Sequence, residues 1–153
     1  MEKTLVLLKP CAVQRELAGE VISRFERRGL RLCGIKMMQL DDNILSEHYA
    51  HIAGKPFFQR LKESMMITPV IACCWEGIDA VNVVRGMSGA TNCRNAAPGT
   101  VRGDFGMSTQ ENIIHSSDSA ENAAIELARF FKKEEIFEYQ KCSSVFLYAN
   151  DEI

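Results

Sequence analysis

The chain has no long apolar run and no excess of positive charge. Its 153 residues contain 18 Lys and Arg against 20 Asp and Glu, a net charge of −2, so composition supplies no electrostatic drive for non-specific binding to nucleic acid. The apolar run near the N-terminus, Leu5 to Leu8, is too short for a signal peptide, and no stretch approaches membrane-spanning length. We therefore expect a cytoplasmic protein with no membrane partner and no strong case for a nucleic-acid partner.

The sequence also lacks the spacing of disulfide frameworks and zinc sites. Its six cysteines contain no C-x-x-C pair, and its three histidines have no zinc-type spacing. We expect reduced and mostly buried thiols at Cys11, Cys33, Cys73, Cys74, Cys93 and Cys142. With 46% hydrophobic and 25% charged residues, the chain suits one globular domain over residues 1–153.

Apolar periodicity predicts alternating strands and helices. Strands are expected at residues 4–8, 30–40, 69–75 and 113–114. Helices are expected at residues 13–25, 44–52, 56–66 and 78–84, and from about Asp118 or Ser119 to Phe131. This β-α-β-α-β-α-β order, without an internal repeat, predicts an α/β sandwich with helices over one sheet.

Residues 86–111 have no convincing period, although half of the ten glycines fall there. Loops without structure that exceed about 12 to 15 residues are uncommon in compact domains and are usually functional or disordered. Arg85 precedes this segment and Arg102 lies within it. Since glycines let backbone amides approach an anion and arginine offers a rigid fork of donors, the segment indicates phosphate binding. The alternative is that both arginines pair with nearby acids, such as Asp79 or Asp104.

His115 follows a short β-branched stretch and precedes a predicted helix N-terminus. Asp118 and Glu121 fit a capping box at that terminus. Free amides and the positive end of the helix dipole favour negative charge there. A neutral imidazole can accept a phosphoryl group through one nitrogen if a neighbour holds the ring. On position alone, however, a packed or solvated histidine is the commoner outcome.

Three further candidates support phosphate and nucleobase handling. Lys9 ends the first predicted strand, and Tyr49 and Phe57-Phe58 lie on neighbouring predicted helices. Lysine offers a point charge to phosphate. Each candidate has a structural alternative: a solvated strand end for Lys9, and core packing for Tyr49 and the phenylalanines. His48 shares the apolar stripe of Tyr49 and is expected to be packed, whereas His51 is expected to be solvated.

From Thr4 to about Tyr148 the sequence resembles the nucleoside diphosphate kinase family. The motifs that carry the resemblance are Lys9-Pro10 with Val13-Gln14-Arg15, His48-Tyr49, Pro56-Phe57-Phe58, Trp75-Glu76-Gly77, Gly89 with Thr91-Asn92, Pro98 to Phe105, and Asn112 to His115 with Ser117, Asp118, Ser119 and Glu121. The resemblance implies a ferredoxin-like α/β (α+β) sandwich. Its four-stranded antiparallel sheet would be of βαββαβ type, covered by helices, with a long glycine-rich loop.

The resemblance implies a ping-pong reaction that maintains nucleotide pools. His115 would take the γ-phosphate of a nucleoside triphosphate, typically ATP, and pass it to a nucleoside diphosphate. Glu126 and Ser117 would position the ring of His115. Lys9 and Asn112 would contact the sugar hydroxyls, and Lys9 and Tyr49 would approach the transferred phosphate. The remaining phosphates would be bound by Arg85, Thr91 and Arg102, and the base would stack on Phe57. Mg²⁺ would bind through the nucleotide phosphates and not directly to the protein. A homo-oligomer is implied, with a hexamer favoured over a tetramer.

The chain departs from the family pattern at three places. Ser116 replaces the usual glycine after the histidine, Cys11-Ala12 replaces an Asp-Gly pair, and Cys93 stands where many relatives have proline at subunit contacts. If Ser116 took a positive φ, it would cost about 1 kcal/mol of strain. The position of Glu126, opposite the apolar stripe of its helix, leaves its contact with His115 open. The rival hypothesis is a non-catalytic nucleotide-sensing or partner-binding protein of the same fold.

Overall fold

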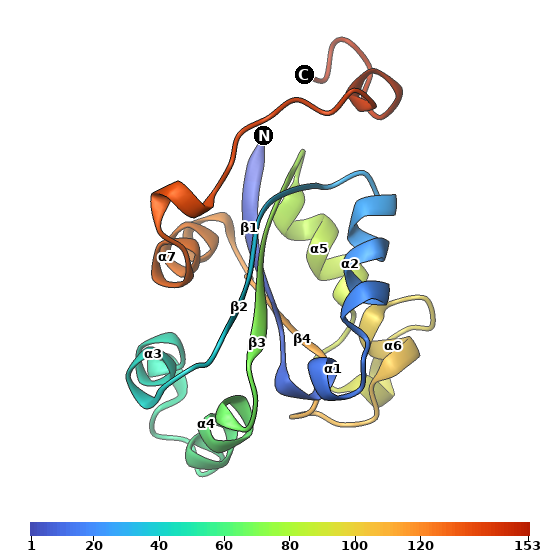
Figure 1. Cartoon of the computed structure of the whole chain (residues 1–153). Helices are drawn as coiled ribbons and strands as arrows, with labels where there is room; N and C mark the ends of the chain where they lie inside the picture. Colours follow the sequence, from blue (N-terminus) through green and yellow to red (C-terminus); the bar gives the residue numbers. More distant parts are fainter.

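Four strands form one antiparallel sheet in the order β2-β3-β1-β4 (Figure 1). The computed structural model describes all 153 residues. The strands are β1 (Glu2–Leu8), β2 (Arg31–Met38), β3 (Val70–Gly77) and β4 (Ile114–Ser116). The helices are α1 (Pro10–Gln14), α2 (Ala18–Arg27), α3 (Asp42–His48), α4 (Phe58–Met66), α5 (Ala80–Ser88), α6 (Val101–Phe105) and α7 (Ala120–Phe130). Short 3-10 turns are η1 (Ala50–Ile52), η2 (Cys93–Asn95), η3 (Lys133–Glu135) and η4 (Ser144–Phe146).

The central strand β1 fixes the architecture. It pairs with β3 along its whole length and with β4 through Val6, Leu7 and Leu8. Strand β2 pairs with the other edge of β3, with an irregularity in register between Leu32 and Gly34. This strand order and the antiparallel pairing confirm the expected ferredoxin-like sandwich. No helix combines the length and the apolar character needed to cross a bilayer.

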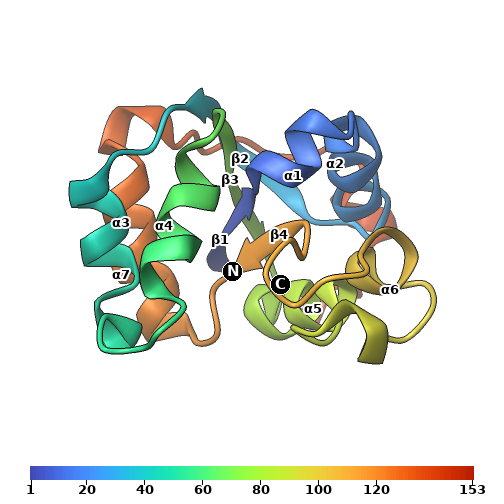
Figure 2. The same cartoon turned by 90° about the horizontal axis from the view of Figure 1, so that it is seen from below.

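Helices cover both faces of the sheet, because β1 is apolar on both sides. Successive strand residues point to opposite faces. Leu5 and Leu7 belong to a core shared with residues of α3, α4 and α7. Val6 and Leu8 belong to a second core with residues of α2, α5 and α6. Figure 2 shows the two groups of helices on either side of the strands.

The predicted helix over residues 13–25 is wrong in one respect: it is two helices. Glu16 takes a φ of 57° between α1 and α2. The amide of Leu17 then donates to the Ala12 carbonyl oxygen at 3.0 Å, which closes the end of α1. A non-glycine residue in the left-handed region breaks the helical hydrogen-bond ladder. The apolar period continues across the break, so it does not reveal it.

The start of α7 also differs from the predicted capping box. Ser119 is the N-cap, and its side chain accepts a hydrogen bond from the amide of Asn122. Asp118 instead accepts from the Asn122 side-chain amide at 2.6 Å. The predicted cap was therefore one residue early. Both residues carry a suitable oxygen, and the sequence alone does not choose between them.

The glycine-rich segment is more ordered than its lack of period indicated. Residues 86–111 contain the end of α5, the turn η2 and the short helix α6. Thr100 caps α6 by accepting from the amide of Gly103 at 3.0 Å. An ideal Cβ on Gly103 would lie 2.0 Å from the Ala97 carbonyl oxygen, so close backbone approach requires glycine there.

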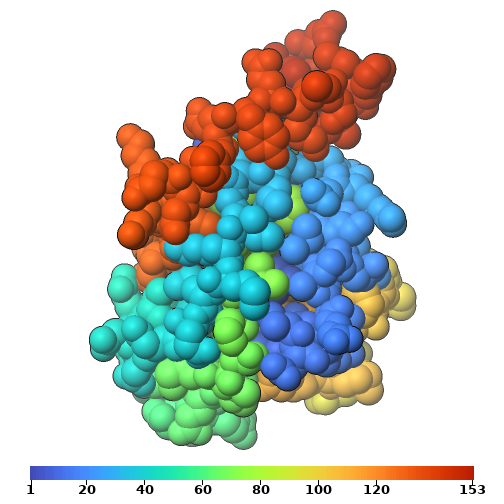
Figure 3. Space-filling view, viewed as in Figure 1, coloured from blue at the N-terminus to red at the C-terminus, as the bar shows by residue number.

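The C-terminal segment extends away from the body of the molecule (Figure 3). Tyr139 ties it to β2 by donating to the Leu32 carbonyl oxygen at 2.8 Å. Lys141 donates to the carbonyl oxygens of Gly29 and Leu30 at 3.2 and 3.3 Å. Phe146 remains 88% exposed. The segment is thus attached at the end of the sheet and leaves apolar side chains uncovered.

Candidate active site

A cavity of about 1040 Å³ lies between the α3–α4 hairpin, the segment before β4 and the helix α7. The sequence-predicted site residues gather there from segments that are far apart along the chain. Those that line the cavity are Lys9, Tyr49, Phe57, Arg85, Thr91, Arg102, Asn112, His115 and Glu126. Ser117 is the one predicted residue outside this lining, and it is fully buried directly behind it.

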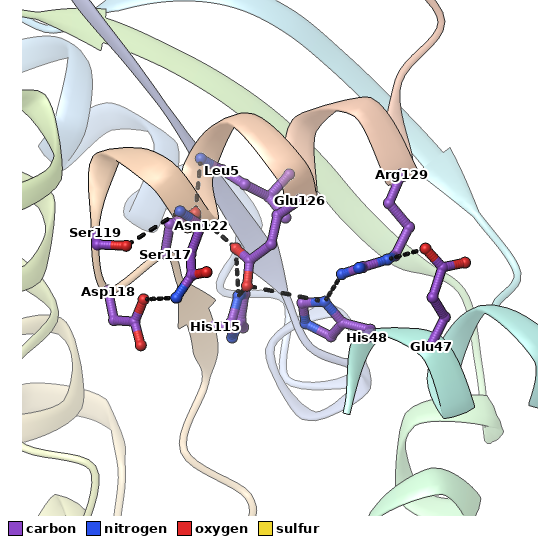
Figure 4. A network of polar contacts seen from close by, with 10 residues as sticks. All are labelled: Leu5, Glu47, His48, His115, Ser117, Asp118, Ser119, Asn122, Glu126 and Arg129. Atoms are coloured by element: carbon purple, nitrogen blue, oxygen red, sulfur yellow. Dashed lines mark hydrogen bonds and ion pairs between the residues drawn. The ribbon is translucent and has the colours of Figure 1, made fainter. Parts of the chain in front are cut away.

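His115 is held through one ring nitrogen (Figure 4). Its Nε2 lies 3.0 and 3.1 Å from the two carboxylate oxygens of Glu126. Ser117 donates from Oγ to the Glu126 carboxylate at 2.6 Å. No hydrogen bond occupies His115 Nδ1. Because α7 packs on β1 beside β4, the second turn of α7 brings Glu126 to the histidine, which resolves the contact that periodicity had left open.

Glu126 stays ionised despite its position. Burial raises the pKa of this carboxyl group, but the hydrogen bonds from His115 and Ser117 outweigh burial and lower it to about 2. A carboxylate is an acceptor only. The His115 nitrogen that faces it must therefore carry a proton, which leaves the lone pair on Nδ1.

His115 lies inside β4, and not at the end of the strand as expected. The reason is an unusual turn just before it. Ile113 is fully buried with a φ of 73°, and the amide of Ile114 donates to the Asn112 carbonyl oxygen at 2.8 Å. A β-branched residue in this region is strained, and such strain concentrates at functional sites. The turn directs Asn112 toward Lys9 while the strand resumes at Ile114.

Lys9 directly follows β1 at the floor of the cavity and is 7% exposed. Its ammonium donates to Asn112 Oδ1 at 2.6 Å and to the Gln110 carbonyl oxygen at 3.2 Å. Burial, with the positive charge of Arg102 adding to it, lowers the pKa of Lys9 to about 8. One of its three donors remains available to a ligand. The alternative of a solvated strand end is wrong.

Arg102 is buried under the cavity and does not pair with an acid. Its guanidinium donates to the carbonyl oxygens of Asn112, Gly89 and Ile114 at 3.1, 2.8 and 2.8 Å. Asp104 pairs instead with Arg24, at 2.6 Å. Since arginine has five N–H donors, two remain after these three bonds. Arg102 thus braces three backbone segments and can still present donors to an anion.

The remaining predicted residues surround the mouth and wall of the cavity. Arg85 and Thr91 are exposed, and Arg85 makes no ion pair. Phe57 is 41% exposed, so it is not the core residue that its spacing allowed. Tyr49 is buried beside His48, and burial raises the pKa of its phenol, which stays protonated and able to donate.

Arg129 and Glu47, which the sequence did not single out, extend the network around Glu126. Arg129 donates from Nη1 to Nδ1 of His48 at 3.2 Å and from Nε to Glu47 at 2.9 Å. His48 Nδ1 lies 3.9 Å from Glu126 Oε1. The spacing of Glu126 and Arg129 on one helix face was the available signal.

A metal site made by the protein itself fits this geometry poorly. His48, His115 and Glu126 have possible ligand atoms within 4.8 Å of one another. However, Arg129 occupies His48 Nδ1 and adds a positive charge. The other cavity carboxylates also have partners: Glu47 accepts from Arg129, and Asp118 accepts from Asn122. The cavity is therefore suited to anions.

The three departures from the family pattern leave this geometry intact. Ser116 has no positive φ, so the expected strain is absent there. Cys93 is buried and packs against Gly106. Cys11 is partly exposed, and burial raises the pKa of its thiol, which keeps it protonated. All six cysteines are unpaired and four are buried, as expected.

Comparison with known proteins agrees with the geometry. A family model described as nucleoside diphosphate kinase matches residues 2–136. A nucleoside diphosphate kinase of Parabacteroides distasonis is 65% identical over 152 residues, which is 99% of each chain. One of Pyrococcus horikoshii is 49% identical, covering 95% of this chain and 94% of that protein.

Solved structures extend the comparison to the fold. A nucleoside diphosphate kinase of Halobacterium salinarum, solved in complex with CDP, superposes with a TM-score of 0.94 at 41% identity, covering 97% of this chain and 99% of that one. The apo enzyme of Encephalitozoon cuniculi gives 0.93 at 38% identity, covering 97% and 100%. The chain therefore belongs to the nucleoside diphosphate kinase family, whose members are phosphotransferases.

Proposed function

We propose that His115 carries the γ-phosphate between nucleotides as a phosphohistidine on Nδ1. The observation that carries this is the pair of contacts, at 3.0 and 3.1 Å, between His115 Nε2 and Glu126. They hold the proton on Nε2 and leave the Nδ1 lone pair for attack. A nitrogen–phosphorus bond forms as the bond from phosphorus to the nucleoside diphosphate oxygen breaks. The second half-reaction reverses this exchange with another nucleoside diphosphate.

Fixed positive charge supports this transfer. Phosphoryl transfer depends mainly on positioning and on neutralising the charge of the phosphate oxygens. Lys9 and Arg102 lie at the floor of the cavity and Arg85 near its mouth. We assign these three residues and Thr91 to the phosphates, Asn112 with Lys9 to the sugar, Tyr49 to the transferred group, and Phe57 to stacking on the base.

Mg²⁺ enters this proposal through the nucleotide. Because the carboxylates around the cavity already accept hydrogen bonds from side chains, we assign no protein ligand to the ion. When bound to the phosphate oxygens, it would supply further charge neutralisation.

A label-transfer experiment separates the kinase from a non-catalytic nucleotide-binding protein of the same fold. The protein is incubated with γ-labelled ATP and Mg²⁺, desalted, and then given unlabelled GDP. We expect an acid-labile, alkali-stable label on the protein that moves to GTP. Nucleotide binding without a protein-bound label would support the binder instead.

Nucleotide affinity is expected to fall above pH 8. A bound polyphosphate favours the charged form of Lys9, whose pKa in the free protein is about 8. Below that pH the ammonium is already charged. Above it, binding must take up a proton, so the dissociation constant of ADP should rise about tenfold between pH 7.5 and 9. Isothermal titration calorimetry in two buffers measures both the affinity and the proton uptake.

The Lys9→Met variant is the control for this pH dependence. It should bind ADP more weakly at every pH, with no change in affinity between pH 7.5 and 9. A wild-type affinity that stays constant over this range would contradict the assignment of Lys9 to the phosphates.

We further propose that the chain, as one domain over residues 1–153, forms a cytosolic homo-oligomer. The outer edge of β2 pairs with no other strand of the chain, and Ile35 and Met37 on it are 50% and 60% exposed. Such an edge favours pairing with another chain. By its resemblance to the family, we favour a hexamer over a tetramer. Light scattering after size exclusion would measure the oligomeric state, and a monomer would contradict the proposal.

The cytosolic location is supported by the six unpaired cysteines, because unpaired thiols fit a reducing compartment.

A further inference from the structure

Arg129 connects an exposed carboxylate with a buried imidazole next to the proposed nucleophile. Its Nε donates to Glu47 Oε1 at 2.9 Å, and its Nη1 lies 3.2 Å from His48 Nδ1. The side chain of Arg129 is 12% exposed, and that of His48 only 1%. Figure 4 shows the chain of contacts from Glu47 through Arg129 and His48 to Glu126. None of the roles assigned above uses this chain.

The contact between Arg129 and His48 fixes the protonation of the imidazole. A guanidinium can only donate hydrogen bonds, so His48 Nδ1 must accept, and the single ring proton resides on Nε2. A second proton, on Nδ1, would bring two donors within 3.2 Å of each other. His48 is therefore neutral, in one tautomer.

The environment of His48 also lowers its pKa, and only one neighbouring group raises it. Burial has the largest effect, and the charges of His115, Arg129 and His51 add to it, whereas Glu126 opposes them. Tyr49 contacts the ring edge-on with its own pKa raised. Burial and the three positive charges outweigh Glu126 and lower the pKa of His48 to about 3.

The tautomer matters because His48 and His115 face the same carboxylate. His48 Nδ1 lies 3.9 Å from Glu126 Oε1, and that oxygen is also 3.1 Å from His115 Nε2. The two imidazole rings lie edge to face with centroids 4.5 Å apart. A proton on His48 Nδ1 would make it a competing donor to Glu126 and would add a positive charge beside the nucleophile.

We propose that Arg129 is a positioning residue for the phosphoryl transfer: it keeps Nδ1 of His48 unprotonated and thereby reserves the Glu126 carboxylate for His115. Glu47 anchors Arg129 from the surface side of α3. This inference rests on the roles of His115 and Glu126 proposed above. It extends the catalytic unit to residues that need not touch the nucleotide.

The test compares the turnover number kcat at pH 5.5 with that at pH 8 in each variant. In Arg129→Met, His48 can take up a proton at Nδ1 and donate a hydrogen bond from Nδ1 to Glu126. We expect the ratio of the two rates to fall about three- to tenfold below the wild-type ratio, as for an imidazole whose pKa returns toward its ordinary range. The double variant Arg129→Met/His48→Phe replaces both partners by apolar groups. Its ratio of kcat at pH 5.5 to kcat at pH 8 should return to the wild-type value, because the phenyl ring at position 48 cannot take up a proton.

Arg27→Met is the matched control, since Arg27 is an exposed arginine on α2. Its ratio should equal that of the wild type. The proposal is overturned if Arg129→Met keeps the wild-type ratio, or if the double variant shows the same extra fall. Labelling with γ-labelled ATP at pH 8 separates the two hypotheses. A wild-type protein without label on His115 contradicts the proposed function, whereas a labelled wild type with an unchanged rate ratio in Arg129→Met contradicts only the role of Arg129.

Nitrogen-detected NMR of the wild-type chain tests the same claim without a variant. Across pH 5 to 8 the His48 spectrum should show a protonated Nε2 and an unprotonated Nδ1. A proton on Nδ1, or titration of the ring within this range, would overturn the proposal.

Discussion

Replacing His115 with asparagine is expected to abolish the phosphoenzyme and to lower nucleotide exchange by about 10⁴-fold or more, the scale of loss that follows removal of an enzyme nucleophile. Asparagine keeps a polar side chain that can donate to Glu126, so the network around Ser117 can persist. It has no nitrogen lone pair that can accept a phosphoryl group. The measurement is the rate of GTP formation from ATP and GDP in a coupled assay.

His51→Asn is the matched control for this variant. His51 is an exposed histidine on η1 that lines the cavity, but its side chain makes no hydrogen bond and has none of the roles proposed above. Its exchange rate should remain within about twofold of the wild type. Equal losses in both variants, or an unimpaired His115→Asn enzyme, would contradict the assignment of the nucleophile.

Arg102→Met is expected to have a large effect on both stability and binding. The substitution removes the Arg102 donor from three carbonyl oxygens. Those of Gly89 and Ile114 lose their donor, whereas that of Asn112 keeps the Ile114 amide. Unsatisfied buried groups cost about 1 to 3 kcal/mol each, with partial relief from relaxation. We expect the free energy of unfolding to fall by about 3 to 5 kcal/mol, measured by urea denaturation at constant m-value.

The affinity of the same variant for ADP should also fall, by about 10- to 100-fold, because charge-assisted hydrogen bonds to phosphate are lost. Arg85→Met separates the two effects. Arg85 is exposed and its guanidinium makes no hydrogen bond within the protein, so its loss should weaken ADP binding but change stability by less than about 0.5 kcal/mol. An Arg102→Met protein as stable as the wild type would contradict the bracing role.

Much of the sheet could be predicted because apolar runs mark its strands. The apolar run from Leu5 to Leu8 predicted the strand β1, and the structure shows that this strand is buried on both faces. The strand ends were less certain. Ile113 has the composition of a strand residue but takes a φ of 73°, and only the surrounding packing imposes that conformation.

The residues of the site were predicted better than their contacts. The residue pattern made His115, Lys9 and Arg102 candidates, each with a structural alternative, and the resemblance to the family assigned their roles. Periodicity could not place Glu126, because its contact depends on how α7 packs on β1. Nor could it show that Arg102 donates to three carbonyl oxygens, since such bonds depend on segments that are distant in sequence.

The residues that the sequence missed act through other side chains. Arg129 was not singled out, because an arginine on an exposed helix is usually solvated. Its contact with His48 spans 81 residues of the chain. A close-packed interior brings such groups together without a local signal.

The most direct test of the central claim is to isolate the labelled wild-type protein and identify the atom that carries the phosphate. Peptide mapping under alkaline conditions identifies the residue, and phosphorus–nitrogen coupling in NMR identifies the nitrogen. We predict phosphate on His115 Nδ1, with Nε2 still protonated toward Glu126. Phosphate on His115 Nε2, on another residue, or on no residue at all would contradict the account.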